Sequence, residues 1–168
     1  MDFLELARRR WSVTDYQRRA VERDKLDKIL AAGLAAPTAG NLQPQRIVTI
    51  DSEEGRQHLE QVIPGKCRAP AALLVCYDKR ECWTRPADGK ASGELDAAIV
   101  TTHMMLAATD LGLGSLWIMN WDPRKMKAAF ALPEEIEPTA LLLVGYAAPD
   151  ARPRPGHLTR KAKEDILL

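Results

Sequence analysis

The stretch "AAPTAGNLQPQR", residues 35–46, is the most informative part of this sequence. It lies between a helix-like and a strand-like segment, and it is more polar and stiffer than a connection requires. Its two prolines fix the backbone angle φ, and Gly40 permits a turn that other residues resist. Asn41 and Gln43 then project amide groups from an immobilised backbone. Such a loop is suited to hydrogen-bond the edge of a planar heterocycle; alternatively, its amides cap its own turn.

Composition predicts one globular domain over residues 1–168. The chain has 168 residues, of which 46% are hydrophobic and 28% charged. Its 24 Lys and Arg residues against 23 Asp and Glu residues give a net charge of +1, so no overall field favours nucleic acid or a membrane. No signal-peptide pattern or membrane-spanning apolar run is present, and the three cysteines lack metal-site spacing. We therefore expect a cytoplasmic protein with small-molecule partners and no metal.

The hydrophobic pattern alternates helices with strands, which predicts an α/β or α+β fold. Helices are expected over residues 24–36, 53–62, 93–114 and 122–130, and strands over 46–51, 71–77, 115–119 and 139–146. The helix over 93–114 is apolar almost all round, so we expect it at the buried centre of the fold or of a dimer. Residues 147–168 are rich in proline and cations and end in an apolar tip. This arm is expected to be either disordered or pinned along a surface, such as that of a partner subunit.

The segment "RRRWSVTDY", residues 8–16, combines three arginines with Ser12 and Thr14 where a helix gives way to extended chain. Arginine forks and hydroxyl groups together suit a phosphate. The alternative is that these cations only complement the dipole at the helix C-terminus.

Two later segments offer weaker indications. In "LGLGSLWIMN" the two glycines lack the full dinucleotide-binding spacing, but Ile118, Met119 and Asn120 end a strand and can point backbone N–H groups at a ligand. The cationic arm is either a solvated surface or part of an anion site; its candidates are His157, Arg160, Lys161 and Lys163. No Ser-His-Asp or Cys-His set indicates hydrolysis, and no catalytic side chain is assigned.

Taken in chain order, these segments resemble the nitroreductase family of FMN-dependent oxidoreductases. The sequence "RWSVTDY" is similar to the family's "RRS-V-R-x-F" opening, and "APTAGNLQPQ" to its "APSAGNxQPW" motif. The sequence "DLGLGSLWIMNWDP" resembles "LGLGSxWIGGFDP", and "LLLVGYAAPD" followed by "RKAKEDIL" resembles the family's ending. The resemblance implies an α+β three-layer sandwich with a mixed or antiparallel central sheet and helices on both faces. It also implies a homodimer with FMN at the interface and a C-terminal arm that extends onto the partner.

The same resemblance assigns site residues. Arg10, Trp11 and Ser12, with Arg160 from the arm, are expected at the phosphate and ribityl end of FMN. The loop that flanks the isoalloxazine, from the other subunit, is expected to contribute Pro37, Thr38, Ala39, Asn41 and Gln43. Ile118, Met119 and Asn120 are expected near the flavin N5 and O4 edge.

This sequence departs from the family's pattern at the pyrimidine edge of the flavin. Thr14 stands where the family usually has Arg or Lys, a cation that stabilises the negative charge of the reduced ring. We hypothesise that Lys66 takes this role. In addition, Met119 and Asn120 replace a usual Gly-Gly pair, which narrows the space over the flavin.

The implied activity is hydride transfer from NAD(P)H, the co-substrate, through flavin N5 to a nitroaromatic, quinone or activated alkene, in a ping-pong sequence. Two alternatives remain: a specialised flavin dehydrogenase or dehalogenase on the same scaffold, and a flavin-binding protein without turnover. The loop over residues 78–93 is the candidate substrate-contacting segment, in which Trp83 either stacks on an acceptor or is a half-buried surface side chain.

Overall fold

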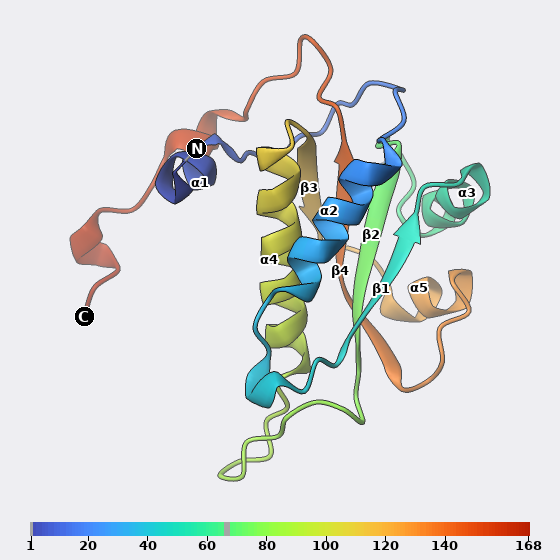
Figure 1. The fold of residues 1–168 in the computed structure, drawn as a ribbon, viewed down its shortest axis with the longest axis vertical. Helices are drawn as coiled ribbons and strands as arrows, with labels where there is room; N and C mark the ends of the chain where they lie inside the picture. The colour runs from blue at the N-terminus through green and yellow to red at the C-terminus, as the bar shows by residue number, and fades with distance from the viewer. Residues whose placement is uncertain (1, 66–67) are drawn as a thin grey trace.

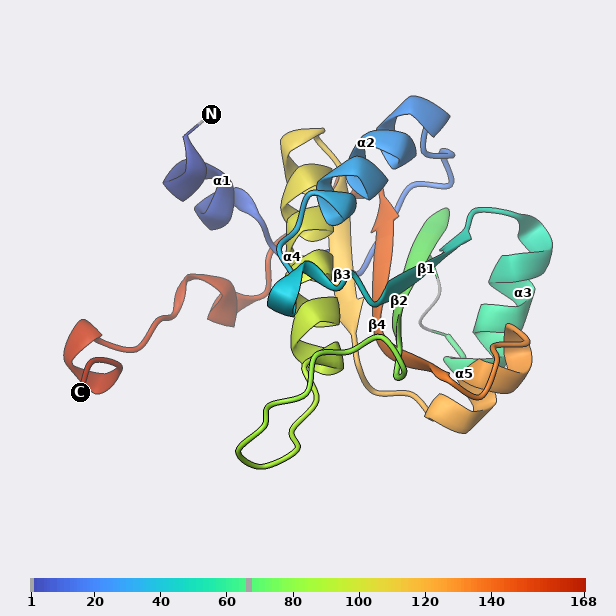
Figure 2. The same cartoon turned by 60° about the horizontal axis from the view of Figure 1, so that its bottom comes forward.

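The computed structural model describes residues 2–65 and 68–168. Its four strands form one antiparallel sheet in the order β1-β2-β4-β3. Their bounds are β1 Gln45–Ile50, β2 Ala71–Asp78, β3 Gly114–Ile118 and β4 Ile136–Gly145. Helices α2 (Arg23–Leu34) and α4 (Gly93–Asp110) cover one face of the sheet, and α3 (Glu53–Val62) and α5 (Pro123–Ala129) lie on the other (Figures 1 and 2). The predicted three-layer α+β arrangement is confirmed, with an antiparallel sheet.

The central strands β2 and β4 are buried on both faces. Leu73 and Val75 point into the cluster beneath α2 and α4, whereas Leu74 and Cys76 point into the cluster beneath α3 and α5. This alternation follows from the two-residue period of a strand. A strand packed on both faces needs apolar residues at every position, which explains the continuous run "AALLVC". Cys76 is fully buried, and burial raises the pKa of its thiol to about 12, so this cysteine acts as a small hydrophobic side chain.

Helix α2 packs closely on α4. A Cβ atom at Gly33 would lie 2.8 Å from Met104 Cγ, so the glycine is what permits this approach. Leu26 and Ile29 are buried on the same face of α2. Helical periodicity over residues 24–36 predicts Leu34 on that face as well. This prediction is wrong, because Leu34 is 66% exposed at the end of the helix.

Helix ends follow their local sequence signals. Helix α4 is followed by Gly112, whose φ of +76° is favourable only for glycine. At the start of α5 the Asp122 carboxylate accepts hydrogen bonds from the backbone N–H groups of Arg124 (2.8 Å) and Lys125 (3.4 Å). A glycine after the last turn and the pair Asp122-Pro123 are the local signals that predict these two ends, although α4 ends at Asp110 and not at residue 114 as expected.

The two ends of the chain extend away from the sheet. Figures 1 and 2 show helix α1 (Phe3–Arg9) and the C-terminal arm, residues 147–168, beyond α4 on the same side of the molecule. The arm contains two short 3-10 helices, η2 (Pro155–Leu158) and η3 (Lys163–Asp165), and most of its side chains are exposed. Among the described helices, none combines the length and apolar character needed to cross a membrane.

Candidate functional site

Residues 10–14 run as extended chain beside the edge strand β3. The Val13 N–H donates to the Ser115 carbonyl oxygen (2.9 Å), and Ser12 forms a parallel bridge with Ser115. The Val13 side chain is fully buried against Gly114, where an added Cβ would lie 2.5 Å from Val13 Cγ2. Because neighbours in extended chain alternate in direction, burying Val13 directs Ser12 and Thr14 away from the core.

The C-terminal arm and this segment together line an open cavity of about 610 Å³. We call it the cationic cavity. Its lining residues are Arg10, Trp11, Ser12, Thr14, Leu116, Arg154, Gly156, His157 and Arg160. The four predicted residues from the N-terminal segment and Arg160 from the arm are therefore brought together, across about 150 positions of sequence.

The charges of the cationic cavity are unbalanced. Three arginines line it, and no carboxylate is among its described lining residues. Arg160 donates only to the backbone carbonyl groups of His157 and of Thr159, the latter at 2.8 Å. Within the described part of the chain, the guanidinium groups of Arg10 and Arg154 have no hydrogen bond or ion pair. Free guanidinium groups around a cavity of this size suit an anionic ligand such as a phosphate ester.

A second, smaller cavity of about 310 Å³ continues from the first. It shares Thr14, Leu116 and Arg154 with the cationic cavity, and its other described lining residues are Asp15, Gly65, Arg68 and Ile118. The Asp15 carboxylate in this lining pairs with Arg68 at 3.9 Å. We call this second cavity the inner cavity. The predicted residue Ile118 is thus connected to the arginine-rich end. Its neighbours Met119, which is 68% exposed, and Asn120 lie on the surface just after β3.

The 37–43 loop is held by its own chain. Gly40, Asn41 and Gln43 have φ values of +59°, +55° and +52°, and two of these three residues are not glycine. Left-handed backbone at such residues costs energy and persists only where surrounding contacts impose it. The Thr38 Oγ1 atom accepts a hydrogen bond from the Gln43 N–H (3.1 Å), and the Thr38 carbonyl accepts from the Asn41 N–H (2.9 Å).

A buried carboxylate anchors this loop to α4. Asp96 is 2% exposed and accepts hydrogen bonds from the Ala39 N–H (2.8 Å) and the Ser92 hydroxyl (2.6 Å). Its position in the first turn of α4 alone predicts only that Asp96 complements the helix dipole. That interpretation missed its partner, because Ala39 is distant in sequence and only the packing of the loop on α4 brings it near.

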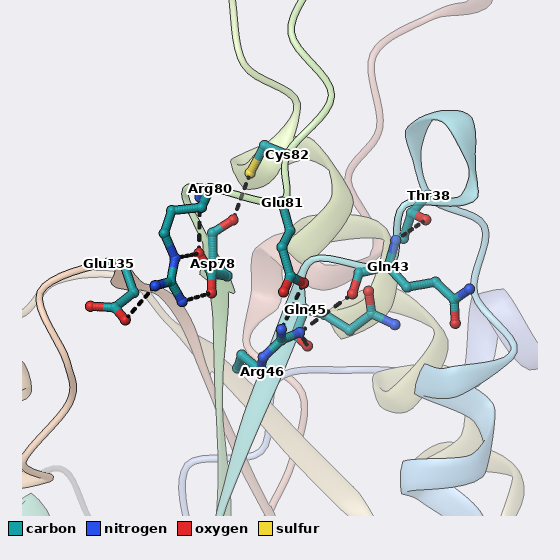
Figure 3. A network of polar contacts seen from close by, with 9 residues as sticks. All are labelled: Thr38, Gln43, Gln45, Arg46, Asp78, Arg80, Glu81, Cys82 and Glu135. Atoms are coloured by element: carbon teal, nitrogen blue, oxygen red, sulfur yellow. Dashed lines mark hydrogen bonds and ion pairs between the residues drawn. The ribbon is translucent and has the colours of Figure 1, made fainter.

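Polar contacts also connect the loop to the segment after β2 (Figure 3). Arg46, just beyond the loop, pairs with Glu81 at 2.6 Å and donates to the Gln45 carbonyl at 3.0 Å. The nearby Asp78 carboxylate receives two hydrogen bonds from the Arg80 guanidinium (3.0 and 2.7 Å), and these bonds hold the pKa of Asp78 at about 2. Arg80 also pairs with Glu135 at 3.0 Å.

The loop over residues 79–92 projects from the end of the molecule near η1 (Ala39–Asn41), as Figures 1 and 2 show. Trp83 lies at the base of this projection and is 41% exposed. A Cβ atom at Gly40 would lie 3.9 Å from Trp83 Cδ1, so the tryptophan borders the 37–43 loop. The burial of the Cys82 thiol raises its pKa, so this neighbouring cysteine is not set up as a thiolate nucleophile.

One chain does not bring all the predicted residues together. The 37–43 loop packs on the N-terminal end of α4, whereas Arg10, Trp11 and Val13 border a cavity with Thr109 and Gly112 at the other end of that helix. No residue of the loop lines the cationic cavity or the inner cavity. Lys66, the proposed replacement for a cation at position 14, lies outside the described residues.

Among the basic residues that line the cationic cavity, the sequence does not assign two, Arg154 and His157, to the flavin. The sequence assigns no role to Arg154 and indicates His157 only as one of several cations in the arm. Their common feature is the run "RPRPGHLTR", in which prolines hold a cationic segment extended. No sequence pattern indicates which surface such a segment covers.

Comparison with known proteins agrees with the fold and with the order of these segments. The nitroreductase family model matches residues 7–72 and 64–146, so the chain belongs to the nitroreductase family. A solved nitroreductase family protein from Clostridium difficile 630 is 44% identical, covers 100% of this chain and 98% of its own, and superposes with a TM-score of 0.92.

Curated relatives are more distant but similar over most of their length. A putative NADH dehydrogenase/NAD(P)H nitroreductase of Methanothermobacter thermautotrophicus is 29% identical, over 88% of this chain and 78% of the relative. An FMN reductase [NAD(P)H] of Bacillus subtilis is 26% identical, over 86% of this chain and 65% of the relative.

Proposed function

We propose that this protein is an FMN-dependent oxidoreductase that takes hydride from NAD(P)H and reduces a small organic acceptor, and that it works as a homodimer. Residues 1–168 form a single flavin-binding domain in this proposal, with residues 147–168 as an arm on the partner subunit. The activities named for the relatives, an NAD(P)H nitroreductase and an FMN reductase, support this reaction class.

The observation that carries the proposal is the cationic cavity. Three arginines from two distant segments line it without a carboxylate among its described lining residues, so their charges are left for a ligand. The phosphate of FMN fits this chemistry because it carries about −1.5 to −2 charges, as a phosphate monoester does. Ser12 adds a hydroxyl donor beside Arg10 and Arg160. The inner cavity extends from this end toward Ile118, which offers a path for the ring system.

When bound, FMN supplies hydride acceptance and donation between NAD(P)H and the acceptor. The residues of this chain bind and orient it. Arg10 and Arg160 neutralise the phosphate, while Asn41 presents its amide group from a backbone that is already fixed. The Gln43 amide nitrogen donates to the Asn41 carbonyl within the loop (3.3 Å), so Gln43 offers the ligand its amide oxygen. Because the loop is ordered before the ligand arrives, little conformational entropy is lost on binding.

Homodimer formation is supported by the exposed apolar surface. Leu95 and Ile99 on the outer face of α4 are 59% and 37% exposed, and the arm ends in exposed Ile166, Leu167 and Leu168. Ordering an extended arm costs about 1–2 kcal/mol per residue in backbone entropy, so contacts outside the monomer are expected to hold it. A second copy also explains why the 37–43 loop lies away from the cationic cavity: the loop of each subunit completes the partner's site.

The acceptor belongs to the class of nitroaromatics, quinones or activated alkenes. Trp83 borders the 37–43 loop and is partly exposed, so it is placed to stack on an aromatic acceptor near the flavin. The projecting 79–92 loop is the segment whose replacement should change acceptor preference.

The proposal is tested with purified protein supplied with FMN. We expect a yellow, dimeric protein that oxidises NADH or NADPH when menadione or a nitrofuran is added. Bound flavin without turnover would favour a flavin-binding protein instead. Protein that stays colourless and monomeric in excess FMN would contradict the proposal.

A further inference from the structure

Arg154 occupies a distinctive place among the cations around the two cavities. Of these two cavities, Arg10 and Arg160 line the cationic cavity and not the inner one, and Arg68 lines the inner cavity and not the cationic one. Of the cations in the described chain, Arg154 alone lines both. A phosphate held by Arg10 and Arg160 would therefore leave Arg154 at the junction, facing the part of the ligand that continues toward Ile118.

The charge of Arg154 is also uncommitted. No side-chain hydrogen bond or ion pair engages its guanidinium within the described part of the chain. Arg68, the other cation of the inner cavity, differs because it pairs with Asp15 at 3.9 Å. Arg152, two positions earlier on the arm, donates to the carbonyl groups of Pro149 (3.0 Å) and Ala151 (2.8 Å) and lines neither cavity.

The backbone holds Arg154 in place. It stands between Pro153 and Pro155 with φ −62° and ψ 150°, the extended conformation that a following proline requires. Its carbonyl accepts the His157 N–H at 2.8 Å, which closes the first turn of η2. A side chain on such a backbone loses less entropy when it binds, because its starting point is already fixed.

Thr14 shares both cavities with Arg154 but contributes no charge. Its hydroxyl donates to the neighbouring Asp15 carboxylate at 3.2 Å. A flavin ring gains negative charge around N1 and O2 on reduction, so a cation next to that edge favours the reduced form. Thr14 cannot supply that cation, and Arg68 is paired with Asp15, so among the described cations of the inner cavity Arg154 is the one with an unpaired charge. The hypothesis that Lys66 takes this role concerns a residue outside the described chain.

We propose that Arg154 is a flavin-tuning residue: its guanidinium lies next to the pyrimidine edge of the isoalloxazine and stabilises the reduced ring, in place of a cation at position 14. This inference rests on the proposed function, because it requires FMN in the two cavities. It separates the arginines into two roles. Arg10 and Arg160 recognise the phosphate, whereas Arg154 recognises the ring.

The test compares FMN with riboflavin, which lacks the phosphate. Affinities for both and the reduction potential of the bound flavin are measured for Arg154→Met, Arg154→Lys, Arg160→Met and Arg152→Met. Arg154→Met should lower the affinities for FMN and for riboflavin by similar factors. It should also lower the affinity for the reduced flavin about tenfold more than the affinity for the oxidised flavin. For a two-electron couple that tenfold difference is a fall of about 30 mV in potential. Arg154→Lys should retain most of the potential.

The two comparison variants define the alternatives. Arg160→Met should lower the affinity for FMN but not for riboflavin, and it should leave the reduction potential unchanged. Arg152→Met should change neither the affinities nor the potential. If Arg154→Met weakens only FMN, or leaves the potential of bound flavin unchanged, Arg154 is a further phosphate ligand and the proposal is overturned. If the unaltered protein binds no flavin at all, the proposed function itself fails, which is a different result from a loaded variant with an unshifted potential.

Discussion

The cationic cavity and the 37–43 loop satisfy their polar groups in opposite ways. In the loop, Thr38 and Asp96 accept the backbone N–H groups of Gln43, Asn41 and Ala39, so the strained turn is complete before any ligand arrives. In the cationic cavity, by contrast, Arg10 and Arg154 have no acceptor within the described chain. A pre-formed loop suits recognition of a rigid ring edge, whereas unsatisfied guanidinium groups suit capture of an anion. The difference indicates which half of a flavin each region recognises.

Disrupting the proposed dimer, which would separate the cationic cavity of one subunit from the 37–43 loop of the other, should have the largest effect on FMN binding. Leu95→Glu combined with Ile99→Glu places charges on the exposed apolar face of α4, where the proposed dimer would bury them without partners. We expect monomers in sedimentation experiments and loss of FMN binding, because each site then lacks the partner's loop. Gln61→Glu, an exposed change on α3 across the sheet, is the matched control and should leave both properties intact. A double variant that stays monomeric yet binds FMN normally would contradict the shared site.

Removing the arginines of the cationic cavity should have the next largest effect on FMN affinity. Each arginine–phosphate contact is worth about 1.5–3 kcal/mol, as for hydrogen bonds to charged groups. Arg10→Met together with Arg160→Met should therefore weaken FMN by at least about 100-fold. Fluorescence titration should show riboflavin binding nearly unchanged, since the ring contacts remain. An equal loss for riboflavin would mean that the arginines act on the structure rather than on the phosphate.

Loosening the loop should have a smaller effect. Asp96→Asn removes the charge and replaces one carboxylate oxygen by an amide NH₂ group, which cannot accept from the Ala39 N–H or the Ser92 hydroxyl. The unpaired donor should cost about 1–3 kcal/mol of stability. We expect a lower free energy of unfolding and faster hydrogen exchange at residues 38–43, with FMN weakened through the loop. Glu94→Gln, an exposed change on the same turn of α4, is the control. Unchanged exchange at the loop in Asp96→Asn would show that the carboxylate does not anchor it.

The smallest expected effect is on the pH dependence of stability, and it comes from the Asp78–Arg80 contact shown in Figure 3. The pKa of Asp78 is lowered to about 2 by its hydrogen bonds with Arg80. A carboxylate with a lowered pKa stabilises the folded protein above its unfolded pKa, near 3.9, and that contribution is lost as the pH falls toward 2. Denaturant unfolding should thus show stability falling between about pH 4 and pH 2, with a shallower fall in Asp78→Asn. An identical pH dependence in both proteins would contradict this account of Asp78.

The elements that sequence predicted best are those with purely local causes. The helix over residues 53–62 has the predicted bounds, and the start of α5 depends on Asp122 and Pro123, which are adjacent to it. The resemblance to nitroreductases also supplied the candidate residues that the cationic cavity brings together. What remained hidden is non-local. The role of Asp96 depends on a loop far away in sequence, and the position of Arg154 depends on the path of an extended arm, which no periodicity encodes.

The central claim is that the arginines of one chain and the 37–43 loop of another share one flavin, and subunit complementation tests it most directly. One variant carries Arg10→Met with Arg160→Met; the other carries Asn41→Gly with Gln43→Gly, which removes the amides while glycine keeps the left-handed backbone. Each variant alone should bind little FMN. Co-expressed with different tags and purified as the mixed dimer, they should regain one intact site, built from the arginines of the second variant and the loop of the first. Mixed dimers that bind no more FMN than either parent would place the arginines and the loop of each site on the same chain and contradict the account.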